Sequence, residues 1–176
     1  MSEDPRPDAE SDEVDRIIAG WAAARPGLDV APMAVLSRIH RLSRHLDVAR
    51  RASFTEAGLE AWEFDVLSAL RRSPEAALSP GALMRSSLVT SGTMTTRIDK
   101  LARRGLVSRQ KDPRDGRGVR VRLEEEGARA VDSAIEQLLR AEQALLSPLP
   151  GQDAEVLADL LRRLLLQFET PPPDGA

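Results

Sequence analysis

The sequence predicts a mainly α-helical protein with one small β-hairpin, an α+β fold. Apolar residues recur at helical spacing along most of its 176 residues. Only around residues 106–123 does the pattern change to short strand-like runs. Hydrophobic residues make up 41% of the chain and charged residues 30%, proportions typical of globular proteins. We therefore assume a single compact unit, or a small lobe with helices that complete their core against a second subunit.

The two ends of the chain differ from its middle. Residues 1–13 are acidic and residues 170–176 are rich in proline, so we expect both ends to be disordered. No run approaches the roughly 18 apolar residues of a membrane span, and the acidic start lacks the layout of a signal peptide. We therefore expect a cytoplasmic protein without a membrane partner. The absence of cysteine excludes disulfides, thiolate metal sites and thiol-based redox sensing.

Helical patterns occupy most of the first half of the chain. A short N-terminal helix is predicted at residues 14–25, with Trp21 as its large aromatic residue. A long helix follows Pro32 and runs to about residue 52, after which residues 54–58 are expected to break it. The next helix covers residues 59–72 and ends before a serine–proline pair.

The middle of the chain is predicted to contain short strands and short helices. Residues 76–78 are predicted to pair as a strand, and Ser79 is expected to cap a short helix that begins at Pro80. Thr90 or Ser91 caps the next helix, which ends at Gly105. Two short strands at residues 106–111 and 119–123 then flank a polar loop with proline and glycines, which predicts a hairpin.

The C-terminal part is again helical. Residues 124–146 form one predicted helix, and prolines and a glycine at 148–151 separate it from a last helix. That last helix carries a broad apolar stripe on one face. The long second helix also carries an apolar stripe near its start. We expect this stripe to form part of a hydrophobic core rather than to line a ligand cavity.

The charge is distributed unevenly along the chain. The formal net charge is −3, which alone would argue against binding to nucleic acid. Between Arg85 and Arg122, however, eleven basic and three acidic residues give +8, and the remainder of the chain carries −11. Such asymmetry is typical of a protein in which one element faces a polyanion.

Two short helices joined through residues 86–89, followed by a basic hairpin, form the pattern of a winged helix-turn-helix over residues 59–123. Small hydroxyl residues at the start of the second helix can approach base edges, and cationic residues can bind phosphates or reach the minor groove. The predicted DNA-binding residues are Thr90, Ser91, Thr93, Thr95, Thr96, Lys100, Arg103, Arg104, Arg114 and Arg117. The alternative is a solvated threonine-rich helix beside an ordinary charged hairpin.

The segment LVTSGTMTTRIDKLARRGLVSR at residues 88–109, with DPRDGR at 112–117, resembles the MarR family of transcriptional regulators. The resemblance extends over roughly residues 32–168. It implies a homodimer in which residues 32–58 and 124–169 intertwine as a helical dimerisation region. The two winged lobes of such a dimer would bind a pseudo-palindromic operator in double-stranded DNA.

Within this family the chain most resembles the urate-responsive and PecS-like branch, which has an extra N-terminal helix. The resemblance implies a binding site for a small anion such as urate, a related purine, citrate or aconitate, and release of a repressor from its operator. The residues that match this site are Trp21, Asp65, Arg97 and Arg109. Alternatively, the tryptophan packs, the aspartate is a surface charge and both arginines contact phosphates, so that the protein binds DNA without a ligand.

No other chemistry is indicated. His40 and His45 are five residues apart, so they do not stack on one face of a helix, and no metal site is expected. The sequence contains no phosphate-binding glycine loop, nucleophile elbow or paired catalytic carboxylates. We therefore expect neither an enzyme nor a cofactor.

Overall fold

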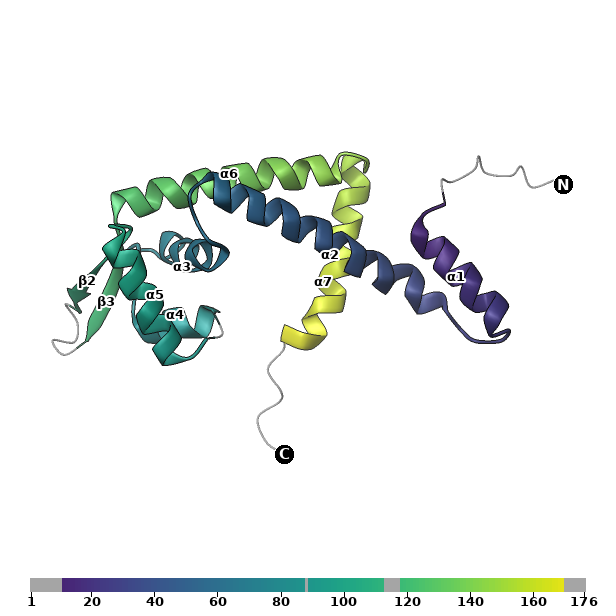
Figure 1. The fold of residues 1–176 in the computed structure, drawn as a ribbon, viewed down its shortest axis with the longest axis horizontal. Helices are drawn as coiled ribbons and strands as arrows, with labels where there is room; N and C mark the ends of the chain where they lie inside the picture. Colours follow the sequence, from purple (N-terminus) through teal and green to yellow (C-terminus); the bar gives the residue numbers. More distant parts are fainter. Residues whose placement is uncertain (1–10, 88, 113–117, 170–176) are drawn as a thin grey trace, which may run out of the picture. The chain divides into compact units, whose positions relative to one another are not determined.

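The computed structural model describes residues 11–87, 89–112 and 118–169. The chain divides into two compact units, residues 1–49 and residues 50–176. This differs from the single compact unit that we assumed. The reason lies in the long helix α2 (Ala31–Glu56), whose buried residues are Ser53 and Phe54, both in the second unit. Figure 1 shows the elements in chain order.

The first unit begins with helix α1 (Glu13–Ala24), which starts one residue earlier than predicted. Asp12 caps it: its carboxylate accepts the N–H groups of Val14 at 2.8 Å and Asp15 at 3.0 Å, and Asp15 accepts the N–H of Asp12 at 3.0 Å. This capping box places residues 12 and 13 in a regular structure, which corrects the predicted disorder there. Residues 1–10 and 170–176, also predicted to be disordered, lie outside the described residues.

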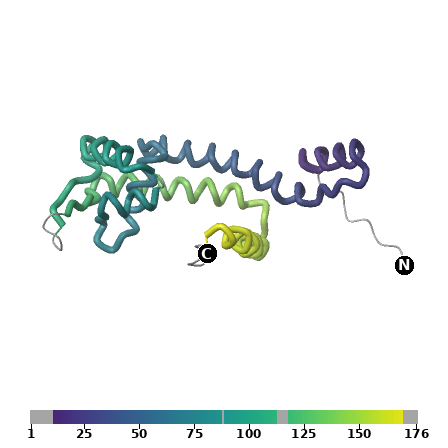
Figure 2. Tube along the Cα trace, turned by 90° about the horizontal axis from the view of Figure 1, so that it is seen from below, coloured from purple at the N-terminus to yellow at the C-terminus, as the bar shows by residue number. Residues whose placement is uncertain are grey.

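Helix α2 continues past residue 52, where we had placed its end. Phe54 does not break the helix because it is buried, 2% exposed, and packs in the core of the second unit. The helix ends where Gly58 adopts a φ of +70°. The N–H of Leu59 then donates to the carbonyl of Phe54 at 2.8 Å, and that of Gly58 to Thr55 at 3.0 Å, the pattern of a Schellman motif. Figure 2 follows this chain path from α1 into α2.

The second unit continues in the predicted order of elements. Its small sheet is antiparallel with strand order β1-β3-β2, and Arg109 on β2 pairs with Val121 on β3. The elements after α2 are α3 (Ala61–Arg71), β1 (Ala77–Leu78), α4 (Pro80–Ser87), α5 (Ser91–Arg103), β2 (Val107–Lys111), β3 (Val119–Leu123), α6 (Glu125–Leu146) and α7 (Gly151–Glu169).

One apolar core joins α3, α4, α5, the sheet and α6. The aromatic rings of Phe54 and Phe64 stack at its edge, with centroids 4.2 Å apart and planes inclined by 15°. The residues at the centre of this core are each at most 3% exposed: Val66, Leu67, Leu70, Leu83, Met94, Ile98, Leu101, Val121, Val131, Ala134 and Leu138. The core therefore fixes α5 against the rest of the lobe along its whole inner face.

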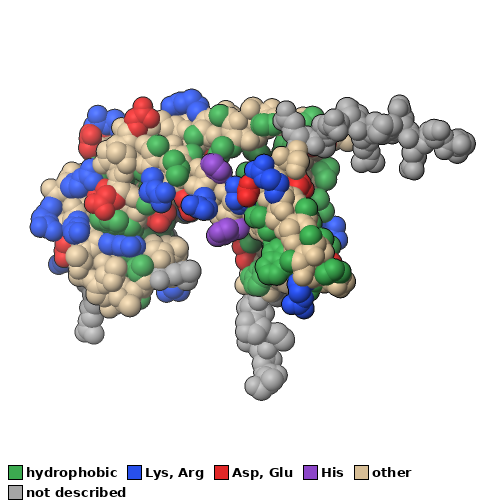
Figure 3. Space-filling model, turned by 45° about the vertical axis from the view of Figure 1, so that its right-hand side comes forward, with side chains coloured by type: hydrophobic (Ala, Val, Ile, Leu, Met, Phe, Trp, Pro, Cys, Tyr) green, Lys and Arg blue, Asp and Glu red, His purple; other side chains and the backbone are tan. Residues whose placement is uncertain are grey.

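Several apolar faces remain uncovered. Helix α7 buries none of its described residues, although it carries seven large exposed apolar side chains, and Figure 3 shows hydrophobic groups on the surface in green. In α2, Val35, Leu36 and Leu42 are also exposed. None of the helices in the described parts of the chain is long and apolar enough to span a bilayer.

Candidate DNA-binding surface

Helices α4 and α5 form the predicted helix-turn-helix. The hydroxyl of Ser79 accepts the N–H of Ala82 at 3.2 Å, so α4 begins as the serine–proline pair indicated. Thr90 caps α5, because its hydroxyl accepts the N–H of Thr93 at 3.4 Å. Leu83 of α4 is fully buried in the same core as the inner face of α5. The two helices are thus held as one unit that presents the outer face of α5 to solvent.

The first two turns of α5 expose small polar side chains. Ser91, Thr93, Thr95 and Thr96 are all exposed. The hydroxyl of Thr95 donates to the carbonyl of Ser91 at 3.0 Å, and that of Thr96 donates to Gly92 at 3.1 Å. Because these hydroxyls donate to their own helix, they offer lone pairs and methyl groups to a partner. Such groups suit the donor groups and thymine methyls of the major groove.

The positive charge predicted for this lobe is visible as blue side chains in Figure 3. Lys100 and Arg103 are exposed on the second half of α5. Arg104 is partly exposed, but its guanidinium forms an ion pair with Glu63 and donates to the carbonyl of Gly58 at 2.8 Å. All three of these cations therefore reach solvent, but the guanidinium of Arg104 also binds the buried Glu63 and a backbone carbonyl.

The hairpin β2–β3 forms the predicted wing. Near the loop end of β3, Arg120 forms an ion pair with Glu75 and donates to the carbonyl of Ala77 at 2.9 Å, which joins β3 to β1 and to the residues before it. Arg114 and Arg117, the predicted DNA contacts at the tip, lie outside the described residues.

Three of the four residues predicted to bind an anion, Asp65, Arg97 and Arg109, lie in this unit but in different surroundings. The guanidinium carbon of Arg97 lies 5.4 Å from the centre of the Trp62 ring, a cation–π contact. Arg109 forms an ion pair with Asp99 at 2.7 Å, which ties β2 to α5. The fourth residue, Trp21, lies on α1 in the first unit and is 46% exposed.

Asp65 is exposed on α3 and lines a cavity of about 450 Å³ between α3 and α6. Arg71 and Asp132, on the wall of this cavity, form a two-point ion pair with distances of 2.9 and 3.1 Å. The hydrogen bonds that Arg71 donates to Asp132 raise the pKa of Arg71. This cavity thus contains groups of both signs beside an apolar wall, and Asp65 belongs to it rather than to the surroundings of Arg97 or Arg109.

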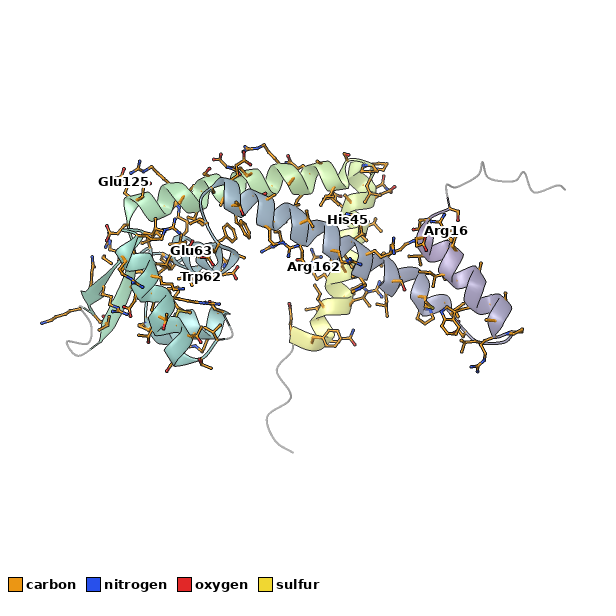
Figure 4. The ribbon with its side chains drawn as sticks, viewed as in Figure 1. Arg16, His45, Trp62, Glu63, Glu125 and Arg162 are labelled. Atoms are coloured by element: carbon orange, nitrogen blue, oxygen red, sulfur yellow. The ribbon has the colours of Figure 1, made fainter. Side chains whose placement is uncertain are left out.

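Sequence reasoning missed the part of α3 that contacts α5. Trp62 and Glu63 lie on the first turn of α3 and are labelled in Figure 4. Glu63 accepts the N–H of Glu60 at 3.0 Å, so the spacing of two glutamates three residues apart at a helix start was the available signal. Within the described ranges, no group of three or more potential ligands could hold a metal ion.

Known proteins resemble the chain in sequence and in fold. The sequence model of the MarR family matches residues 57–118. The HTH-type transcriptional regulator PecS of Dickeya dadantii (strain 3937) is 33% identical over 153 residues, which cover 86% of this chain and 92% of PecS. The HTH-type transcriptional repressor YetL of Bacillus subtilis (strain 168) is 26% identical over 151 residues, 84% of this chain and 90% of YetL.

Among solved structures, a mutant MarR from E. coli complexed with operator DNA superposes with a TM-score of 0.60 at 25% identity. This match covers 88% of the chain and 99% of that protein. The names of the matched relatives are those of transcriptional regulators, which confirms the expectation that the chain is not an enzyme. The extent of the PecS match, the family model and the winged helix-turn-helix together show that the chain belongs to the MarR family.

Proposed function

We propose that the protein is a transcriptional repressor that binds a pseudo-palindromic operator as a homodimer and is released by a small anion. The observation that carries the DNA-binding role is the outer face of α5. That face exposes four small hydroxyl residues in its first two turns and two cations, Lys100 and Arg103, in the second half of the helix. Operator DNA in the MarR complex and the repressor name of YetL support the same role. A protein acting on chromosomal DNA would work in the cytoplasm, as the sequence predicts.

Dimerisation is supported by the uncovered apolar faces. Burying an apolar side chain such as leucine stabilises a protein by about 1.5–3 kcal/mol. Leaving the apolar face of α7 exposed to water is therefore unfavourable. A second copy of the chain would cover α7 and the apolar face of α2, in agreement with the predicted dimerisation region at residues 32–58 and 124–169. The exposed side chains of α7 are Val156, Leu157, Leu160, Leu164, Leu165, Leu166 and Phe168.

Light scattering after gel filtration tests the dimer directly. The expected mass is about twice the 19.2 kDa of one chain. A Leu160→Glu, Leu164→Glu double variant is expected to lower the mass toward one chain, since it places charges on the apolar face of α7. Arg162→Ala is the control, because Arg162 is exposed and pairs with Asp159 one turn before it within α7 itself. A wild-type mass of 19.2 kDa at micromolar concentration would contradict the proposal.

Release by an anion is supported by the partners of Arg97 and Arg109. Arg109 connects β2 to α5 through Asp99, and Arg97 connects α5 to Trp62 of α3. An anion that binds either guanidinium competes with its contact to Asp99 or to Trp62. It would therefore weaken the contacts that hold α5 against β2 or α3. A coupling free energy of only about 1–3 kcal/mol between binding of the anion and binding of the operator DNA would release the operator. The alternative is a regulator of the same fold without a ligand.

The experiment is a mobility-shift titration with DNA from the protein's own promoter region, repeated with urate, xanthine, citrate and aconitate. Binding at low salt is expected, with release by one of the four anions. Arg97→Gln and Arg109→Gln should raise the anion concentration needed for release, without a matching loss of thermal stability. DNA binding that no anion disturbs would favour the ligand-free alternative, and no binding at low salt would contradict the DNA-binding role.

A further inference from the structure

The side chain of Glu63 is buried, with 3% of its surface exposed. It lies on the first turn of α3, where its Oε2 accepts the backbone N–H of Glu60 at 3.0 Å. The same oxygen accepts a hydrogen bond from Nη1 of Arg104. A buried carboxylate without a partner is strongly unfavourable, so this pairing constrains where Arg104 can be.

Arg104 is the residue that follows the last turn of α5. Its Nη2 donates to the carbonyl oxygen of Gly58 at 2.8 Å, in the turn between α2 and α3. One guanidinium therefore binds the start of α3 and the end of the preceding turn at once. Planar guanidinium groups with two fixed contacts hold their position better than a single charge would.

A second contact joins the same turn of α3 to the middle of α5. The ring of Trp62 lies under Arg97 and under Lys100, with cation-to-centroid distances of 5.4 and 5.8 Å. The indole N–H of Trp62 donates to Glu60 at 2.8 Å, which fixes the ring on α3. The first turn of α3 thus contacts α5 from its middle to its C-terminal end.

We propose that Glu63 and Arg104 are positioning residues that hold the C-terminal end of α5 and thereby set the orientation in which it meets DNA. Arg104 then acts through Glu63 and Gly58 rather than as the phosphate ligand that the sequence suggested. This inference rests on the proposed DNA-binding function. The inner face of α5 fixes its depth in the lobe, whereas the contacts of Arg104 anchor one end and so limit its tilt.

The two roles of Arg104 predict opposite effects of changing Glu63. If Arg104 positions the helix, Glu63→Gln loosens its anchor and weakens DNA binding at every salt concentration. If Arg104 binds a phosphate, Glu63→Gln frees a cation for DNA, so binding becomes tighter and more dependent on salt. Each phosphate contact contributes about 0.9 to the slope of log affinity against log salt.

The test measures fluorescence anisotropy of labelled promoter DNA at several salt concentrations with Glu63→Gln, Arg104→Met and the double variant. Gln keeps the volume of Glu63 and the acceptor for the N–H of Glu60, and circular dichroism confirms folding at the assay temperature. Each single variant should weaken binding roughly three- to tenfold with an unchanged slope, and the double variant should be no weaker than the worse single one. Arg103→Met, the matched control, should lower the slope by about 0.9.

A second measurement does not depend on DNA. Hydrogen exchange at the amides of residues 100–106 should be faster in Glu63→Gln and Arg104→Met and unchanged in Arg103→Met. Wild-type protein that fails to bind DNA would overturn the proposed function, and unchanged exchange would then overturn this inference separately. A lower salt slope in Arg104→Met, or tighter binding by Glu63→Gln, would overturn the inference alone.

Discussion

Gly127 on α6 lies against the backbone carbonyl of Leu106, so close that a Cβ atom on Gly127 would be 2.2 Å from the oxygen. The same carbonyl accepts the N–H of Glu124 at 3.0 Å, just before α6 begins. Close approach of two backbones therefore joins the start of α6 to the start of β2. Only glycine permits this approach, because any side chain would fill the space.

Gly127→Ala is expected to destabilise the protein by about 1–3 kcal/mol, since either α6 or β2 must shift. This is opposite in sign to the usual gain of up to about 1 kcal/mol for replacing a helical glycine with alanine. Urea denaturation followed by circular dichroism measures the change. Gly20→Ala on α1 is the control, because a Cβ there would meet no described atom within 4 Å beyond its chain neighbours and the backbone of its own helix, and it should be neutral or stabilising. Equal effects of the two substitutions would contradict the close packing of α6 on β2.

The stacked pair Phe54 and Phe64 joins the end of α2 to α3. Phe54→Ala should lower the free energy of unfolding by about 3–5 kcal/mol, because it removes a buried ring and leaves a cavity. Thermal denaturation measures the loss. Val119→Ala, at an exposed position of β3, should change stability by less than about 0.5 kcal/mol. A small effect at Phe54 would mean that the end of α2 is not part of the core of this unit.

The contact between α1 and α2 is expected to depend on pH. Arg38 donates to Asp12 at 2.8 Å and to Asp15 at 2.7 Å, and its hydrogen bond lowers the pKa of Asp12 below the ordinary value of 3.8. Because the pKa of Asp12 is lowered by folding, its ionised carboxylate stabilises the contact between α1 and α2 fully above pH 3.8. This stabilisation is lost as the pH falls through the lowered pKa of Asp12 in the folded protein. Hydrogen exchange at α1 amides should therefore accelerate as the pH is lowered below 3.8, after correction for intrinsic rates.

Arg38→Met should reduce this acid dependence, because the backbone N–H groups of Asp15 and Val14 still lower the pKa of Asp12. It should also leave α1 amides exchanging faster already at about pH 6, where the wild type keeps its contact with Arg38. Arg16→Met is the control, because Arg16 is exposed and pairs with Glu13 within α1 itself. High salt should reduce the difference between the wild type and Arg38→Met, since the paired groups are partly exposed. An acid transition of unchanged size in Arg38→Met would contradict the role of Arg38 and assign the transition to the capping hydrogen bonds of Asp12 or to other carboxylates.

Binding of DNA by the wing is tested through its arginines. Arg114→Ala or Arg117→Ala should weaken binding to all sequences and lower the salt slope by about 0.9 for each phosphate that the variant no longer binds. Arg129→Ala, an exposed residue of α6 paired with Glu126, should leave the slope unchanged. Unchanged slopes in both wing variants would remove the wing from the interface.

Ser91, the first residue of α5, is expected to contact base edges. Ser91→Ala should change the preferred base at one position of each half-site, with a cost of about 1–3 kcal/mol at that position. Binding to a library of operator variants measures the preference. A uniform decrease of affinity across the library would instead indicate a phosphate contact.

The sequence by itself determined the order and type of the elements, because period and capping signals are local. Thr90 caps α5 and Gly105 ends it, with a φ of +70°, as the residue types predicted. The family was likewise predicted from a contiguous stretch, residues 88–109. The end of α2 was misplaced because only burial in the core shows that Phe54 continues the helix.

Tertiary structure alone decided which charged side chains are available to a partner. In the sequence Arg103 and Arg104 are equivalent cations, and both are exposed, yet Arg103 donates within its own helix whereas Arg104 binds a buried carboxylate 41 positions away. Similarly, Arg97, Arg109 and Asp65 share one predicted site, yet Arg97 lies over Trp62, Arg109 pairs with Asp99, and Asp65 lines the cavity between α3 and α6. Local periodicity specifies the face of a helix on which a residue lies, whereas its ion-pair partner depends on how distant segments pack.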